Sequence, residues 1–273
     1  MASGGMRWIW VSVVVMSLAG CWHKEPPAPD AGQADSSIAA NAPSLDPHLH
    51  QPFSQATLSD PPEDALVPPD TTMTGKSVGK LYEEVKALWD DVRFVSPKGK
   101  QLAYNAIVDT EVGTIDIVLR PDLAPNHVRS FVALARAHYF DGLVFERAIH
   151  DENPDARLDM IEAGCPLGQG DVGLGSIGYW LKPEASAEGI NDEGAVGACH
   201  VAGGMDACCF YITLVKIPAM DGDYTVFGKV TRGLDVARKI LSLPLSNESS
   251  GQRPLKPVVM RSVTIETHEV EKH

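Results

Sequence analysis

Half of the prolines in this chain lie in one stretch, which separates two kinds of sequence. Residues 22–76 hold ten of the twenty prolines, and they carry eight acidic residues against two lysines. Proline interrupts helices and central strands, and no apolar periodicity survives among these residues. We therefore expect residues 21–76 to form a disordered, acidic tether that precedes a folded domain.

The segment before this tether is apolar and short. Residues 1–20 contain one charged side chain, Arg7, and the apolar run that follows it is too short to cross a bilayer as a helix. A basic start, a short apolar core and small residues are typical of a secretory signal peptide. Residues 18–21, Leu-Ala-Gly-Cys, resemble the bacterial lipobox. The resemblance implies lipidation of Cys21, and a plain signal peptide with an incidental cysteine is the alternative.

Regular periodicity begins after the tether. Apolar residues recur with helical spacing from Val78 to Trp89, which predicts an amphipathic helix that docks on the following domain. We assign residues 77–101 to this docking helix and a connector. From Leu102 the spacing changes to period two, which indicates strands.

Short strands and two helices account for most of the remaining sequence. The helices are predicted to begin at Pro125, which suits a first helical turn, and at Leu234. Many strands with few helices predict an antiparallel barrel or sandwich over residues 102–273. The further predicted strands lie at residues 113–119, 144–145, 159–163, 195–199, 210–214, 225–230 and 258–267.

The charge of the chain limits its partners. Lysine and arginine number 23 against 36 acidic residues, for a formal net charge of −13. Nucleic acids and anionic lipid surfaces are bound by basic faces. We therefore expect no nucleic-acid partner.

Six segments of the chain share the order and motifs of a known family. They are residues 113–125, 130–135, 139–147, 164–179, 210–213 and 220–230. Read in this order, they resemble the bacterial form of the cyclophilin family of peptidyl-prolyl isomerases. The resemblance covers about residues 106–241, and the final strand is a weaker match. It implies a mainly β fold, a closed eight-stranded antiparallel barrel with a helix over each end.

The chemistry of such an isomerase is electrostatic. Rotation about a peptide bond meets a barrier of about 18–20 kcal/mol, set by amide resonance. A catalyst holds the proline ring in an apolar pocket and stabilises the twisted amide, whose nitrogen regains a lone pair that a fixed cation can stabilise. The reaction requires no cofactor and no metal, and we expect none. Arg147 matches the family's catalytic arginine, and the alternative is a surface arginine paired with Glu146 or Asp151.

The expected substrate-binding residues depart from the family's usual pattern. Asp159 stands in the place of a pocket phenylalanine, Glu162 replaces a glutamine and His200 replaces an asparagine. The turn after Arg147 is lengthened to residues 148–158 and is rich in charge. These departures favour weak or substrate-restricted activity, or none. The expected substrate-binding set is Phe145, Asp159, Met160, Glu162, Cys199, His200, Cys209, Tyr211, Ala219 and Met220.

Four cysteines follow Cys21, and an exported protein permits disulfides. Cys208 and Cys209 are adjacent on a predicted strand, so their side chains should point to opposite faces. The resemblance places Cys199 and Cys209 at the groove, beside His200. A redox pair or a metal site is one interpretation. Buried free thiols are the other, which we favour because no Cys-x-x-Cys spacing supports zinc.

Two functions remain open at this point. The first is an envelope-anchored peptidyl-prolyl cis-trans isomerase, a monomer that acts on X–Pro bonds of exported proteins. It would be a lipoprotein held on the membrane by its lipid and facing the periplasm or the exterior. The alternative is a catalytically inactive cyclophilin-like module that binds proline-containing segments without turnover.

Overall fold

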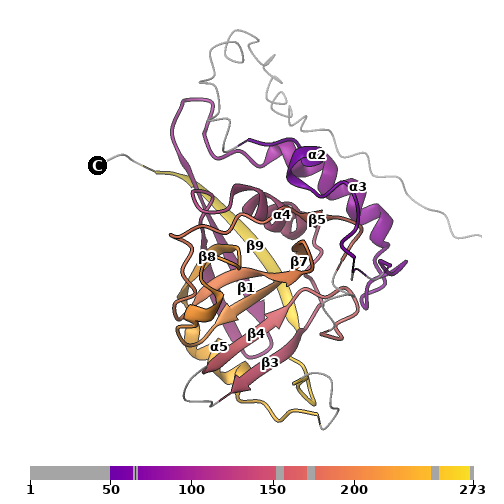
Figure 1. Ribbon diagram of the computed structural model, residues 1–273, viewed down its shortest axis with the longest axis vertical. Coiled ribbons are helices and arrows are strands. Elements are labelled where there is room, and N and C mark those ends of the chain that lie inside the picture. The colour runs from indigo at the N-terminus through magenta and orange to yellow at the C-terminus, as the bar shows by residue number, and fades with distance from the viewer. Residues whose placement is uncertain are drawn as a thin grey trace, which may run out of the picture.

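The computed structural model describes residues 50–63, 65, 67–151, 157–170, 176–246 and 252–270 (Figure 1). The expected signal peptide, Cys21 and the first part of the tether lie outside these residues. Among the described residues, no helix is both long enough and apolar enough to cross a membrane.

Nine strands form one antiparallel sheet in the order β3-β4-β7-β6-β8-β2-β1-β9, and β5 pairs with β7. The mainly β fold predicted from the sequence is confirmed. The strands are β1 (Leu102–Thr110), β2 (Gly113–Leu119), β3 (Phe145–Asp151), β4 (Leu158–Ala163), β5 (Trp180–Leu181), β6 (Ala195–Val201), β7 (Gly204–Thr213), β8 (Val226–Arg232) and β9 (Met260–Glu269).

The sequence predicts a closed barrel, but no continuous ladder closes the sheet in the described residues. The paired path is open, and β3 and β9 are its two end strands. An isolated bridge joins Val144 to Val259, and the Phe145 N–H donates to the Val258 carbonyl oxygen at 2.9 Å. The two ends of the path therefore meet through residues next to the end strands rather than through a continuous ladder.

Four α-helices surround the sheet in the described residues. In Figure 1, α2 and α3 lie at the end of the sheet where α4 packs, and α5 lies toward the other end. Two short 3₁₀ helices, η1 and η3, follow α3 and β7. The helical elements are α2 (Phe53–Ala56), α3 (Val78–Leu88), η1 (Trp89–Asp91), α4 (Pro125–Arg136), η3 (Pro218–Met220) and α5 (Leu234–Leu241).

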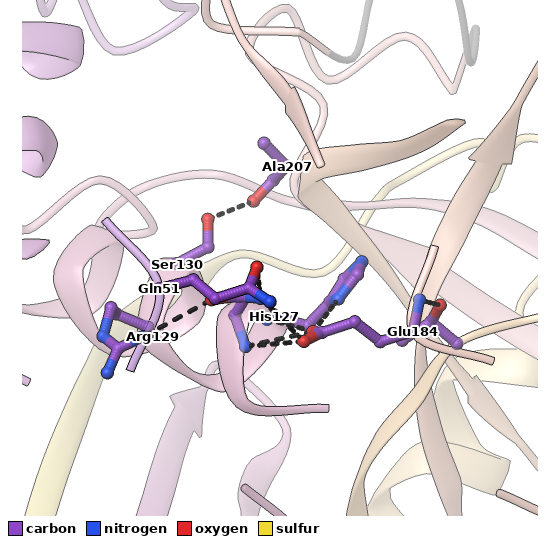
Figure 2. A network of polar contacts seen from close by, with 8 residues as sticks. Gln51, His127, Arg129, Ser130, Glu184 and Ala207 are labelled. Atoms are coloured by element: carbon purple, nitrogen blue, oxygen red, sulfur yellow. Dashed lines mark hydrogen bonds and ion pairs between the residues drawn. The ribbon is translucent and has the colours of Figure 1, made fainter. Parts of the chain in front are cut away.

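Helix α4 is the best-anchored helix of the core. It begins at Pro125, whose missing N–H is no loss in a first turn. The Glu184 carboxylate accepts hydrogen bonds from the N–H groups of Asn126 and His127 and from His127 Nδ1, the last at 2.7 Å (Figure 2). A carboxylate at this helix end satisfies N–H groups that have no partner within the helix. The helix is thereby fixed against the sheet.

Residues 50–63 pack on the domain, which corrects the predicted tether. The Phe53 ring contacts the rings of Tyr82, Trp89 and Tyr179 edge-on, with centroid distances of 5.0–5.7 Å. Ala56 is buried between these elements. The expectation of a disordered tether therefore does not describe residues 50–63. Helix α3 buries Val78, Leu81 and Val85 against the domain, and its Tyr82 ring is only partly buried. Phe53, one of the few apolar residues of segment 50–63, packs on that ring.

Candidate active site

A cavity of about 630 Å³ lies beside β4 and beside β3, the strand that carries Arg147. Its floor is an apolar cluster that is separate from the main core. The cluster consists of Ile149, Met160, Tyr211, Ile217 and Met220. The complete lining is Arg147, Ile149, Arg157, Leu158, Met160, Glu162, Cys199, His200, Tyr211, Lys216, Ile217, Pro218, Ala219, Met220 and Tyr224.

Strand alternation explains how β3 and β4 build one wall of this cavity. Successive side chains of a strand point to opposite faces, so every second residue shares a face. On β4, Leu158, Met160 and Glu162 line the cavity, and on β3, Arg147 and Ile149 do so. The two strands thus present a charged pair and three apolar side chains to the same space.

Arg147 and Glu162 face one another across the β3–β4 ladder. Their side chains form an ion pair, with Arg147 Nη1 2.6 Å from Glu162 Oε2, and their exposed fractions are 21% and 9%. Burial raises the pKa of Glu162, and the nearby guanidinium lowers it in part. Gly170 lies against the arginine: a Cβ there would be 2.5 Å from Arg147 Cγ, and its φ of +69° suits glycine. The guanidinium is therefore held at the cavity from two sides.

Tyr211 forms the centre of the floor. Its hydroxyl donates to Asn191 Oδ1 at 2.6 Å, and burial raises the pKa of the phenol, so the donor proton is retained. Its ring lies over Gly197, where an added Cβ would be 2.2 Å from the Tyr211 oxygen. The Tyr224 ring meets it edge-on at 6.0 Å. The Tyr211 ring is therefore held in the floor by a hydrogen bond, by an edge-on ring and by the close approach of Gly197.

Most of the residues expected from the sequence line this cavity. They come from β3, β4, β6, β7 and η3, which are far apart in the chain. The expected residues that meet here are Arg147, Met160, Glu162, Cys199, His200, Tyr211, Ala219 and Met220.

Three of the expected residues lie elsewhere. Phe145 is in the main core against Phe210, because the β3–β4 register shifts between Phe145 and Arg147 and ends the alternation. Asp159 points away from Met160, as period two requires, and is buried against His150 and Arg157. Cys209 is buried too and does not line the cavity. These three expected site residues therefore do not line the cavity, and their role in substrate binding stays a prediction.

Seven lining residues were not predicted from the sequence. Two of them, Ile149 and Leu158, lie two residues from Arg147 and Met160, so period-two alternation would have identified them. Four others lie in connections between elements, whose course the local sequence does not determine, and Pro218 begins the 3₁₀ helix η3. The four residues in connections are Arg157, Lys216, Ile217 and Tyr224.

A cluster of acids and thiols lies behind the cavity. Glu146 Oε1 accepts the Cys165 N–H at 2.9 Å, and the Cys209 thiol lies 3.9 Å from the same oxygen. The side chains of Cys199 and Cys209 hydrogen-bond to one another, and burial raises the pKa of Cys199 to about 12.

The four described cysteines, Cys165, Cys199, Cys208 and Cys209, are buried, and no disulfide joins any two of them. In the described part of the chain, no group of three histidine, cysteine or acidic side chains is arranged to hold a metal ion.

Comparison with known proteins identifies this architecture. The family model for "Cyclophilin type peptidyl-prolyl cis-trans isomerase/CLD" matches residues 106–265. Peptidyl-prolyl cis-trans isomerase-like 1 of Neurospora crassa is 31% identical over 170 residues, which cover 62% of this chain and 99% of that protein. Peptidyl-prolyl cis-trans isomerase-like 2 of Rhizopus delemar is 29% identical over 186 residues, or 68% of this chain. The match covers only 33% of that longer relative.

Solved structures agree on the fold. A cyclophilin type peptidyl-prolyl cis-trans isomerase from Cryptosporidium parvum matches with a TM-score of 0.53 and 20% identity, over 60% of this chain and 98% of that one. A second structure of that protein, determined in the presence of the dipeptide Ala-Pro, matches with a TM-score of 0.52. Because the family match extends over residues 106–265, more than half of the chain, the chain belongs to the cyclophilin-type peptidyl-prolyl cis-trans isomerase family.

Proposed function

We propose that this chain is an active peptidyl-prolyl cis-trans isomerase that acts on X–Pro bonds of exported proteins. The observation that carries the proposal is the position of Arg147, whose guanidinium borders an apolar floor large enough for a proline ring. Arginine remains charged at any physiological pH and presents a rigid fork of donors. The export of the substrates rests on the signal-peptide and lipobox pattern at residues 1–21.

The mechanism that follows is non-covalent. The proline ring packs on Met160 and Tyr211, and this contact orients the preceding peptide bond toward Arg147. As the amide twists, its resonance is lost and the prolyl nitrogen regains a lone pair. A donor from Arg147 stabilises this lone pair more than it stabilises the planar ground state, which lowers the barrier. Glu162 holds the arginine in place and shares its charge.

A second function is supported by the same ion pair. The Glu162 carboxylate lies 2.6 Å from Arg147 Nη1 and partly neutralises the charge that the transition state needs. In that case the cavity binds proline-containing segments without accelerating their exchange. The two functions differ in turnover rather than in ligand.

Peptide exchange kinetics distinguish the two functions. We expect the full chain to accelerate cis/trans exchange of an Ala-Pro peptide, measured by NMR exchange spectroscopy. Arg147→Ala should lower kcat/KM at least tenfold, which corresponds to about 1.4 kcal/mol of transition-state stabilisation. Arg232→Ala, which removes an exposed arginine paired with Asp116, is the matched control and should not alter the rate.

The absence of any acceleration would refute the isomerase proposal. Peptide-induced shifts at Arg147, Met160 and Tyr211, with an unchanged exchange rate, would instead support the binding module.

We also propose that the protein is attached to the membrane of the cell envelope through lipidated Cys21. The support is the sequence Leu-Ala-Gly-Cys at residues 18–21 after a short apolar run. Metabolic labelling with palmitate should mark the natural chain and leave Cys21→Ser unlabelled. A label that persists in the Cys21→Ser chain would contradict the assignment.

A further inference from the structure

The lining of the cavity is more basic than the rest of the molecule. The chain carries a formal net charge of −13, yet three cationic side chains line the cavity, Arg147, Arg157 and Lys216. Glu162 is the acidic residue of the described lining, and its carboxylate is already bound by Arg147. Among the described lining residues, Arg157 and Lys216 are thus the cations that an acidic lining residue does not pair.

Arg157 and Lys216 lie at the same end of the cavity. In the β4–β7 ladder Glu162 pairs with Tyr211 and Met160 pairs with Thr213. The Leu214 N–H donates to the Asp159 carbonyl oxygen at 2.8 Å, so the pairing continues past Met160. Arg157 directly precedes Leu158, the first residue of β4, and Lys216 follows Thr213, the last residue of β7, after a bend at residues 214 and 215. Both cations line the cavity, and both come from the end of the β4–β7 ladder at Met160 rather than from the level of Glu162.

The acidic partners of these cations leave them accessible to a ligand. Asp159, the partner of Arg157, is 4% exposed, does not line the cavity and accepts Nε and Nη2 at 3.0 and 2.7 Å. Arg157 itself is 60% exposed. Within the described residues these contacts leave Nη1 available for a second carboxylate. Asp159 therefore orients Arg157 from behind.

Lys216 is held more loosely. It lies 3.5 Å from Asp192, and the exposed fractions of the two side chains are 59% and 46%. An exposed pair of this kind contributes little to stability, so a lysine can exchange one carboxylate for another at low cost. Together the two residues form a site for one acidic side chain beside the apolar floor.

We propose that the cavity selects proline-containing segments with an acidic side chain within two residues of the proline, and that Arg157 and Lys216 determine this preference. The proposal rests on the proposed function, because it names the substrate class of the same cavity. The proline ring occupies the Met160–Tyr211 floor, and the carboxylate of its neighbour binds at the Arg157–Lys216 end. The ligand carboxylate would form one partly exposed charge pair with Arg157 and one with Lys216. Two such pairs correspond to a preference of about five- to tenfold for the acidic peptide.

The test compares charge-matched peptides on the full chain. Ala-Ala-Pro-Glu-Ala and Ala-Glu-Pro-Ala-Ala are compared with the same peptides carrying lysine in place of glutamate, by exchange kinetics and by binding titration. We expect at least one glutamate peptide to be preferred about five- to tenfold at low salt. The preference should fall toward one in 0.5 M salt, because exposed charges are screened.

Two variants assign the preference to its residues. Lys216→Glu, which has no buried partner, should abolish or reverse the preference for glutamate. Arg157→Gln should reduce it, although this change leaves the buried Asp159 without its cation and requires a check of folding by circular dichroism. Lys80→Glu is the control, since it makes the same charge change on the exposed face of α3.

The outcomes separate this inference from the isomerase proposal. Equal acceleration of glutamate and lysine peptides would overturn the charge preference and leave the isomerase activity standing. Absence of acceleration for every peptide would refute the activity, and the titrations would then test the preference by themselves. A glutamate preference that Lys216→Glu and Lys80→Glu reduce equally would show a general field effect and would overturn the assigned residues.

Discussion

Two buried glutamates on the neighbouring strands β3 and β4 have very different surroundings. Glu162 faces the cavity on β4 and lies 2.6 Å from the guanidinium of Arg147. Glu146, next to Arg147 on β3, is fully buried behind the cavity. Its Oε1 accepts the Cys165 N–H, and its Oε2 has no hydrogen-bond partner among the described residues.

The difference concerns which carboxylate can carry a charge. Burial raises the pKa of both groups, but Arg147 opposes this effect at Glu162, whereas Glu146 has no cation and its pKa rises well above the usual value. The negative charge of Glu162, which faces the cavity, is therefore balanced by the guanidinium of Arg147. Burial shifts the carboxyl behind the cavity toward its neutral form.

The largest expected effect comes from removing the cation. Arg147→Met leaves Glu162 as a buried acid without a partner, and breaking a buried pair costs about 3–5 kcal/mol. Since the arginine is 21% exposed, we expect a loss of about 2 kcal/mol in urea unfolding at pH 8. Arg147→Met combined with Glu162→Gln should recover most of that loss. Equal stability of the single and double variants would show that the pair is not coupled.

Per pH unit, a smaller effect is expected from the titration of Glu146. Near pH 4.5, the ordinary value for this group, the folded protein holds a protonated Glu146 and the unfolded chain begins to release its proton. Above that pH, stability should fall by up to about 1.4 kcal/mol per unit until the folded pKa is reached. Glu146→Gln mimics the protonated acid and should lack this fall.

Urea unfolding of the natural chain and of Glu146→Gln from pH 4 to pH 8 measures this difference directly. Parallel stability curves for the two proteins would mean that Glu146 is not perturbed by burial. The Glu162→Gln variant provides the comparison for a carboxyl that has a cation.

The smallest effect concerns Tyr211 in the floor of the cavity. Tyr211→Phe removes a buried hydrogen bond to Asn191 Oδ1 and leaves that acceptor unpaired, at a cost of about 1–2 kcal/mol. The ring remains, so kcat/KM for an Ala-Pro peptide should change less than Arg147→Ala changes it. Thermal unfolding and exchange kinetics of the same sample test both parts. A rate loss as large as that of Arg147→Ala would assign the hydroxyl a direct part in the reaction.

Ordered motifs in the sequence predicted the family and most of the cavity. The segment that ends at Arg147 and the strands around Met160 and Tyr211 led to residues that do line one cavity. Phe145 lies in the main core instead of the cavity lining, and the register shift in β3 next to it cannot be recognised from local spacing. Asp159 lies outside the lining because strand alternation places its neighbours Leu158 and Met160 on the opposite face.

The proline-rich stretch shows the same limit at a larger scale. Its composition predicted disorder as far as residue 76, and yet Phe53 and Ala56 are packed against α3 and β5. Composition shows how few apolar residues a segment contains. It does not show whether another part of the fold offers those few residues a surface on which to pack.

The sequence by itself determined the mainly β cyclophilin-type domain, the start of α4 at Pro125 and the position of Arg147, because strand alternation, helix-start chemistry and ordered motifs are local properties. The tertiary structure alone decided which carboxyl meets a cation and which is enclosed with thiols. It also decided that Arg157 and Lys216 lie at one end of the cavity. Burial and distance between residues far apart in the chain set those outcomes, because the free energy of a charge depends on its surroundings and not on its place in the sequence.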